Sequence, residues 1–169
     1  EQISEVLAEK ALEGKRVVRL KGGDPFLFGR GGEELEVLVR EGVPYEVVPG
    51  VTSAIAVPAY QGIPVTHRDF CSSVHIITGH KREGEAYNID FEALVRTEGT
   101  LVFLMGVSSL EAICEGLLKA GIREDMPAAL LARGTTAAQD RVVATVATLP
   151  QAVAAHGAIT PAIIVVGEV

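Results

Sequence analysis

The chain has 169 residues, a formal net charge of -7 and a hydrophobic content of 48%. With 22% charged residues, this composition excludes a disordered chain and predicts a core that needs no disulfide or metal. The basic residues are scattered along an acidic chain, so we expect no nucleic-acid partner. The apolar runs are too short to span a bilayer and no signal peptide is visible, so we expect no membrane association. Two isolated cysteines outside any zinc motif fit a cytoplasmic protein.

The predicted elements alternate between helices and strands. Apolar residues at helical spacing predict helices, and short β-branched runs bounded by glycine or proline predict strands. In chain order the pattern predicts helix 1–13, strand 16–20, helix 33–42, strand 45–50, helix 52–62, strand 74–80, helix 90–97, strand 100–106, helix 109–121, strands 127–134 and 141–149, helix 150–156 and strand 162–167. Pro58 should kink or shorten its helix.

The near-continuous apolar strands predict an α/β fold with a buried, largely parallel sheet and helices on its faces. Segment 141–149 alternates more strictly and is the candidate for an antiparallel or edge strand. Residues 62–73 show no period and predict a connection between two lobes. We therefore divide the chain into an incomplete N-terminal lobe, 1–68, and a C-terminal lobe, 69–169.

Unusual residues follow several of the predicted strands. The turns read GGDP, PGVTSA, LMGVSS and ARGTT. In open α/β sheets, ligands bind outside the carboxyl ends of the strands. If these turns point the same way, they build one crevice.

The GGDP turn combines close backbone approach with a carboxylate. Gly22 and Gly23 can adopt conformations that bring the backbone near a ligand, and Asp24 offers an anionic acceptor. A carboxylate repels phosphate but accepts hydrogen bonds from a ribose diol or a cationic group. The spacing matches neither a dinucleotide fingerprint nor a P-loop. The same residues are equally consistent with an aspartate that only caps the following helix.

The other turns allow both a binding and a structural interpretation. Thr52 and Ser53 precede a predicted helix, where free N–H groups suit a carboxylate, although either hydroxyl can simply cap the helix. Met105 could pack against a ligand ring or lie in the core. Gly134 leaves room for a flat base or merely ends a strand.

Three basic side chains are candidates for holding an anionic substrate. Arg30 lies in a glycine-rich loop, and His67 with Arg68 lies at the predicted lobe junction. Such side chains hold carboxylates by charge-assisted hydrogen bonds, and a structural network around Asp69 is the alternative. The sequence offers no Ser-His-Asp triad, carboxylate dyad or metal motif. Group transfer to or from a bound small molecule is therefore favoured over hydrolysis.

The ordered set of motifs resembles a known family. The segments are VVRLKGGDPFLFGRGGEE, VVPGVTSA, GIPVTHRD, SSVHIITGH, TLVFLMG and PAIIVVG. Together they are similar to the tetrapyrrole methylases, and within them to the uroporphyrinogen-III C-methyltransferases, over nearly the whole chain. The resemblance implies a two-lobed class III methyltransferase fold, a homodimer, and S-adenosylmethionine bound between the lobes. It also implies C-methylation of uroporphyrinogen III to precorrin-2, in siroheme or cobalamin biosynthesis, without a metal.

The resemblance implies roles for particular residues. The cofactor-binding set is Gly22, Gly23, Asp24, Leu27, Thr52, Ser53, Met105, Gly134 and Ala162. Charge and placement suggest Arg30, His67 and Arg68 for the tetrapyrrole carboxylates. The family's opening strand, glycine-rich loop and proton-transfer residues precede the part that matches EQISEVLAEK. We therefore expect a truncated first lobe, no identifiable catalytic residue in this chain, and weak or no activity of the chain alone.

Other functions remain open at the level of sequence. One is another tetrapyrrole (precorrin) methylase, or a methylase acting on RNA or a modified histidine. A second is a nucleotide-binding oxidoreductase, against which the absent dinucleotide fingerprint argues. A third is a non-catalytic binding module. The sequence does not separate the siroheme branch from the cobalamin branch.

Overall fold

The structure is a computed structural model that describes residues 2–79, 89–157 and 159–169. It separates into two compact units, Glu1–Thr52 and Ser53–Val169. The second unit thus begins earlier than residue 69, where we placed the C-terminal lobe. The division of the family's lobes at residues 68 and 69 stays a prediction.

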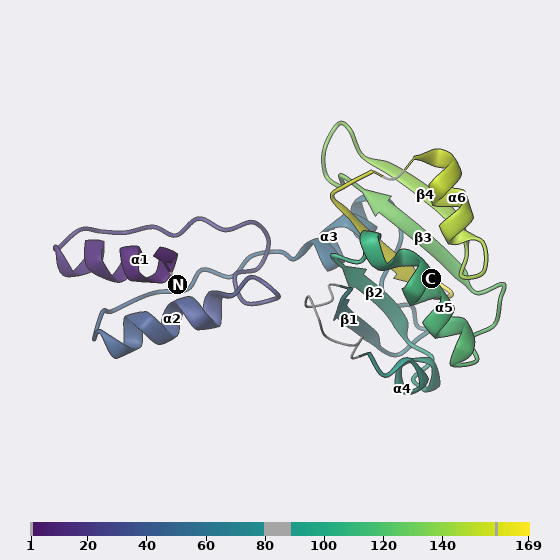
Figure 1. The fold of residues 1–169 in the computed structure, drawn as a ribbon, viewed down its shortest axis with the longest axis horizontal. Helices are drawn as coiled ribbons and strands as arrows, with labels where there is room; N and C mark the ends of the chain where they lie inside the picture. The colour runs from purple at the N-terminus through teal and green to yellow at the C-terminus, as the bar shows by residue number, and fades with distance from the viewer. Residues whose placement is uncertain (1, 80–88, 158) are drawn as a thin grey trace. The chain divides into compact units, whose positions relative to one another are not determined.

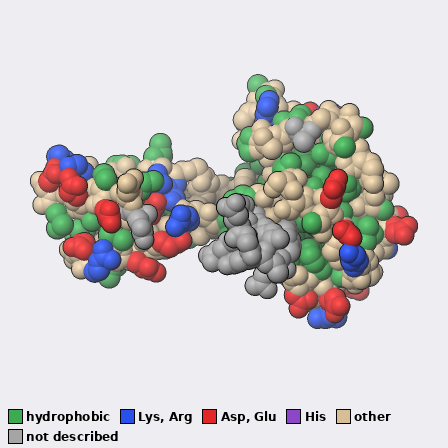
Figure 2. Space-filling view, viewed as in Figure 1, with side chains coloured by type: hydrophobic (Ala, Val, Ile, Leu, Met, Phe, Trp, Pro, Cys, Tyr) green, Lys and Arg blue, Asp and Glu red, His purple; other side chains and the backbone are tan. Residues whose placement is uncertain are grey.

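The first unit is built on two helices that lie side by side, α1 (Gln2–Leu12) and α2 (Gly31–Arg40) (Figure 1). Both confirm predicted helices. Acidic and basic side chains are interspersed over their surface (Figure 2), and Lys10 pairs with Glu13 at 2.7 Å. These exposed pairs contribute little stability individually.

The strands predicted at 16–20 and 45–50 are wrong, because the described residues of the first unit form no strand. A strand requires a hydrogen-bonded neighbour, and no other extended segment pairs with these two. Their apolar side chains are left in solvent: Val18 is 80% exposed, Leu20 85% and Val48 76%.

The second unit contains a five-stranded sheet in the order β1-β2-β5-β3-β4. The strands are β1 (Val74–Thr78), β2 (Thr100–Leu104), β3 (Pro127–Ala132), β4 (Asp140–Thr145) and β5 (Ala162–Val166). Only β1 and β2 pair in parallel, so the prediction of a largely parallel sheet is wrong. Strand β5 inserts between β2 and β3 with the opposite direction, and a run that is apolar on both faces does not encode direction. The predicted antiparallel edge strand is confirmed by β4.

Helices cover both faces of this sheet (Figure 1). On one face lies α3 (Ser53–Tyr60), and on the other lie α4 (Phe91–Arg96), α5 (Leu110–Lys119) and α6 (Leu149–His156). Side chains alternate between two buried clusters, so Phe103 and Ile164 pack towards α5 while Val102 and Ile163 pack towards α3. Helix α3 contains Pro58 and ends at Tyr60, which makes it shorter than predicted. A short 3-10 turn, Val107–Ser109, leads into α5.

Candidate functional site

A cavity of about 760 Å³ lies at one end of the sheet in the second unit. Strands β2 and β3 both run antiparallel to β5, so they share a direction, and their carboxyl ends lie at the same end of the sheet. The cavity is bounded by the segments after these strands, by the start of α3 and by the start of β5. Its lining residues are Ser53, Val57, Leu104, Met105, Val107, Ser108, Leu131, Arg133, Gly134, Thr136, Thr160, Pro161, Ala162 and Ile163.

Met105 follows β2 in a left-handed backbone conformation, with φ of 55°. Its residue surface is 50% exposed, and the side chain borders the cavity instead of joining the core. A non-glycine residue at positive φ costs energy, and such residues cluster at functional sites. The placement favours contact with a ligand over the core interpretation.

Gly134 is required for the packing of the turn after β3. A Cβ atom built on Gly134 would lie 2.4 Å from Cγ1 of Val57 in α3. The absence of a side chain therefore lets the turn approach the helix closely. Gly134 and Val57 together close one side of the cavity.

The GGDP turn belongs to the first unit, where Asp24 organises the backbone. Its Oδ1 accepts hydrogen bonds from the backbone N–H groups of Phe26, at 2.9 Å, and Leu27, at 3.1 Å. Its Oδ2 accepts one from Gly50 at 3.4 Å. The bonds from Phe26, Leu27 and Gly50 hold the pKa of Asp24 below its usual range. Asp24 therefore caps its own turn, and α2 begins only at Gly31.

The second turn of this unit, PGVT, touches the first at Gly50. A Cβ atom on Gly50 would lie 2.1 Å from the carbonyl oxygen of Gly23, so only glycine fits. Gly23 has a φ of 70° and would place a Cβ atom 3.7 Å from Cα of Thr52. Sequence analysis treated Gly50 as the end of a strand and missed this approach, which the Pro-Gly pair could have signalled.

The candidate cationic side chains belong to both units. Arg30 is a left-handed residue of the first unit whose Nε lies 3.4 Å from Oε1 of Glu33. In the second unit, the His67 ring packs against Phe70 with centroids 4.7 Å apart, and its Nδ1 accepts from the N–H of Asp69 at 3.2 Å. These contacts form the local network around Asp69 that was the alternative for His67, and their hydrogen bond uses Nδ1 of the ring. Arg68 is exposed beside it.

The cofactor set predicted from the sequence falls into two local groups. In the second unit Ser53, Met105, Gly134 and Ala162 line the same cavity. In the first unit the members lie on or next to the two touching turns: Gly22, Gly23, Asp24, Leu27 and Thr52. Sequence analysis missed Ser108, Arg133, Thr136 and Thr160, which also line the cavity. Arg133 and Thr136 belong to the ARGTT motif itself, and that membership was the available signal.

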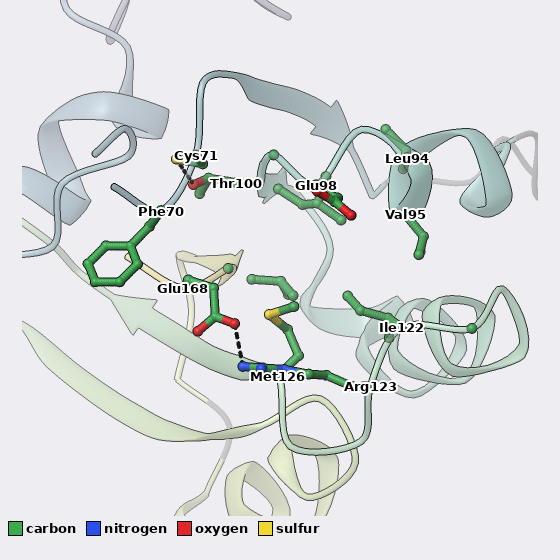
Figure 3. Close-up of a pocket in the computed structure, with 15 residues that line it drawn as sticks. Phe70, Cys71, Leu94, Val95, Glu98, Thr100, Ile122, Arg123, Met126 and Glu168 are labelled. Carbon is green, nitrogen blue, oxygen red and sulfur yellow. Dashed lines mark hydrogen bonds and ion pairs between the residues drawn. The ribbon is translucent and has the colours of Figure 1, made fainter. Parts of the chain in front are cut away.

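Another cavity, of about 400 Å³, lies at the opposite end of the sheet (Figure 3). It contains the ion pair of Arg123 with Glu168, and Sγ of Cys71 lies 3.3 Å from Oγ1 of Thr100. None of the predicted site residues lines it. Across residues 2–79, 89–157 and 159–169, no three His, Cys, Asp or Glu side chains are grouped to hold a metal. Within the same residues no helix has the length and apolar character of a membrane span.

Comparison with known proteins establishes the class of protein. Residues 1–150 match the family described as Tetrapyrrole (Corrin/Porphyrin) Methylases. The chain belongs to this family, which confirms the resemblance drawn from its motifs.

Particular relatives narrow the similarity further. The chain is 59% identical, over its whole length, to the Porphyrin biosynthesis protein HemD of Ruminiclostridium josui and 50% identical to the Siroheme synthase of Pseudomonas fluorescens strain SBW25. It spans only 34% and 36% of those two proteins. Among solved structures it is similar to uroporphyrin-III C-methyl transferase from Thermus thermophilus complexed with S-adenyl homocysteine. That match has 38% identity, a TM-score of 0.82, and covers 99% of this chain and 72% of that one.

The cobalt precorrin-4 methyltransferase CbiF is also similar, with 28% identity and a TM-score of 0.87 over 98% of this chain and 69% of that one. Both structural matches confirm the predicted α/β fold of the tetrapyrrole methylases.

Proposed function

We propose that the protein carrying this chain is an S-adenosylmethionine-dependent methyltransferase that converts uroporphyrinogen III to precorrin-2. The observation that carries the proposal is the convergence of Ser53, Met105, Gly134 and Ala162 on one cavity. These residues come from motifs far apart in the sequence, and the resemblance of those motifs to the family implies a cofactor role for each of them. The 38% identical structure complexed with S-adenyl homocysteine supports the choice of cofactor.

The cavity suits the flat and weakly polar parts of the cofactor. Its lining is mainly apolar, and its polar members are Ser53, Ser108, Arg133, Thr136 and Thr160. Met105 can pack its polarisable thioether against a ring, and Gly134 lets the turn after β3 pack closely on Val57 at the cavity wall. Ligand sites commonly combine such apolar walls with a few polar groups that fix orientation.

The touching turns of the first unit suit the ribose and the amino-acid moiety. Asp24 already accepts three backbone N–H groups, but two carboxylate oxygens offer about four acceptor positions. A ribose hydroxyl can therefore donate to Asp24 without displacing a backbone bond. Its lowered pKa keeps the carboxylate ionised at neutral pH. We assign Gly22, Gly23, Leu27 and Thr52 to the same group of contacts.

The proposed chemistry places most of the reactivity in the cofactor. A pyrrole carbon of the substrate forms a bond to the methyl group, the carbon–sulfur bond breaks, and its electron pair remains on a neutral thioether. The methylated ring then loses a proton, and a second transfer follows after cofactor exchange. The protein's main contribution is to hold both partners in line. Arg30, His67 and Arg68 are proposed to bind substrate carboxylates, and a cytoplasmic homodimer belongs to the same proposal.

A second candidate, methylation of a later precorrin, is favoured by the similarity to CbiF. Membership in the methylase family removes the oxidoreductase alternative. One experiment separates the candidates. The protein is incubated with S-adenosylmethionine and uroporphyrinogen III under reducing conditions, and the mass of the product is measured by mass spectrometry. We expect addition of two methyl groups. Methylation of a precorrin but not of uroporphyrinogen III would support the second candidate, and methylation of neither would contradict both.

A further inference from the structure

Two basic side chains just before the GGDP turn converge on one glutamate of α2. Arg19 Nε donates to Oε1 of Glu34 at 3.1 Å, and Lys21 Nζ donates to Oε2 of the same side chain at 3.2 Å. The side chains of Lys21 and Glu34 are only 14% and 13% exposed, whereas that of Arg19 is 39% exposed. All three residues belong to the first unit. Lys21 immediately precedes Gly22, the first residue assigned to the cofactor.

The alternation of an extended chain explains this convergence. Successive side chains point to opposite sides, so Arg19 and Lys21 share one side while Val18 and Leu20 share the other. The apolar side is exposed, and the basic side meets α2. This segment has no strand partner among residues 2–52. The ion pairs with Glu34 attach it to α2 instead.

Glu34 is charged in spite of its partial burial. Desolvation raises the pKa of Glu34, but the hydrogen bonds from Lys21 and Arg19 outweigh this effect and leave the pKa below its usual range. Both carboxylate oxygens have a donor. Glu34 also lies in the first turn of α2, where the helix dipole favours an acidic group.

The neighbouring Glu33 provides a contrast within the same motif. It pairs with Arg30 at 3.4 Å, and the two side chains are 58% and 77% exposed. Solvent and salt screen such a pair, so it contributes little. The two adjacent glutamates of GRGGEE therefore differ in burial and pairing: Glu34 forms a largely buried ion pair, whereas Glu33 forms an exposed one.

Helix α2 also holds the far end of the turn. The N–H of Gly31, its first residue, donates to the carbonyl of Pro25 at 3.0 Å. A Cβ atom on Gly31 would lie 2.5 Å from that same oxygen, which shows how closely the helix start approaches the turn. The segment between Lys21 and Pro25 is thus attached to α2 at both ends, by Glu34 and by Gly31.

We propose that Glu34 is a positioning residue that, through Lys21, fixes the backbone of Gly22, Gly23 and Asp24 for binding of an S-adenosyl ligand. The inference rests on the proposed function, because it requires that this turn binds the cofactor. Glu34 does not touch the ligand. Its carboxylate acts by holding the chain that leads into the turn against α2.

The test compares variants of the ion pair in the protein that carries this chain. Glu34→Gln and Lys21→Met each remove one charge, the double variant removes both, and Lys21→Arg keeps a donor. Glu36→Gln is the matched control, because it removes the same charge from an exposed position of the same helix. The dissociation constant for S-adenosylhomocysteine is measured by calorimetry. Exchange of the Phe26 and Leu27 amide hydrogens is measured without ligand.

We expect Glu34→Gln and Lys21→Met each to weaken binding by roughly 5- to 30-fold, which lies within the range of coupling between residues in contact. The double variant should lose no more than either single one, because both changes break the same pair. Lys21→Arg should bind within about threefold of the wild type, since it restores a charge-assisted bond. Glu36→Gln should match the wild type, and amide exchange should accelerate in Glu34→Gln.

Three results would contradict the proposal, and they can be distinguished. If the wild type binds and Glu34→Gln binds equally well, with only its melting temperature lowered, Glu34 is merely structural and the proposed function stands. If the wild type itself binds no S-adenosylhomocysteine, the proposed function fails and this inference fails with it. Unchanged amide exchange in Glu34→Gln would count against the positioning role even if affinity changes.

Discussion

The two units use similar apolar segments in opposite ways. In the second unit Phe103 and Ile164 lie on paired strands and are fully buried. In the first unit Val18, Leu20 and Val48 lie on extended segments without strand partners and remain exposed. The sequences of both sets read as strands. The difference teaches that an apolar β-branched run becomes a strand only where a neighbouring segment accepts its backbone hydrogen bonds.

The largest expected effect comes from replacing one large apolar side chain in each unit by alanine and comparing the losses of stability. Phe103→Ala should lower the free energy of unfolding by roughly 3–5 kcal/mol, because it empties a fully buried site between the sheet and α5. Leu20→Ala removes a side chain that is 85% exposed and should change it by less than about 0.5 kcal/mol. Urea denaturation followed by far-ultraviolet circular dichroism measures both. Equal losses would mean that Leu20 is buried in the native protein and that the contrast is wrong.

Close approaches of glycine sharpen the comparison, because each unit contains one beside residues that we assign to the cofactor. Gly50→Ala drives a Cβ atom into the backbone oxygen of Gly23, whereas Gly134→Ala drives one into the side chain of Val57. A side chain can rotate away more easily than a backbone can move. Overpacking typically lowers the free energy of unfolding by roughly 1–3 kcal/mol. We therefore expect a loss near the upper end of this range for Gly50→Ala and near the lower end for Gly134→Ala.

Gly32→Ala is the matched control for both glycine variants, because nothing lies within 4 Å of a Cβ atom there and the residue is in α2. Replacing a helical glycine by alanine should stabilise by roughly 0.5–1 kcal/mol. Thermal melts of the three variants give the comparison. A Gly50→Ala protein as stable as the wild type would contradict the contact between the two turns.

The smallest expected effect is the response of each unit to acid. Hydrogen bonds from His156 Nε2, at 2.8 Å, and from the N–H of Arg141 hold the pKa of Asp140 below its usual range, as those from Phe26 and Leu27 do for Asp24. A carboxyl whose pKa is lower in the folded state stabilises the fold above its unfolded pKa, about 4. This contribution is lost as the pH falls through the lowered folded pKa.

Asp140→Asn should therefore have a lower urea midpoint than the wild type at pH 7. Between pH 5 and pH 3, the urea midpoint of Asp140→Asn should fall by less than that of the wild type. Parallel pH dependence in the two proteins would show that Asp140 makes no such contribution. Asp24→Asn offers the same comparison in the first unit, with one difference. Its amide can still accept from Phe26 and Leu27, but its NH₂ group would face the N–H of Gly50.

The sequence predicted the helices and the strands of the second unit because periodicity and glycine boundaries are local signals. It misassigned residues 16–20 and 45–50 because pairing depends on other segments, and it missed the direction of β5 for the same reason. The gathering of Met105 and Gly134 at one cavity could be predicted, because both residues follow strands whose carboxyl ends lie at the same end of the sheet. The approach of Gly50 to Gly23 could not, because it is a tertiary contact between irregular segments.

Calorimetric titration with S-adenosylhomocysteine tests the central claim most directly. The account predicts saturable binding by the wild-type protein. Asp24→Ala should bind at least about 10-fold more weakly, because it loses an acceptor for the ligand and the backbone bonds that shape the turn. Equal affinity of the two proteins would remove Asp24 from the site. Absence of binding by the wild type would contradict the account as a whole.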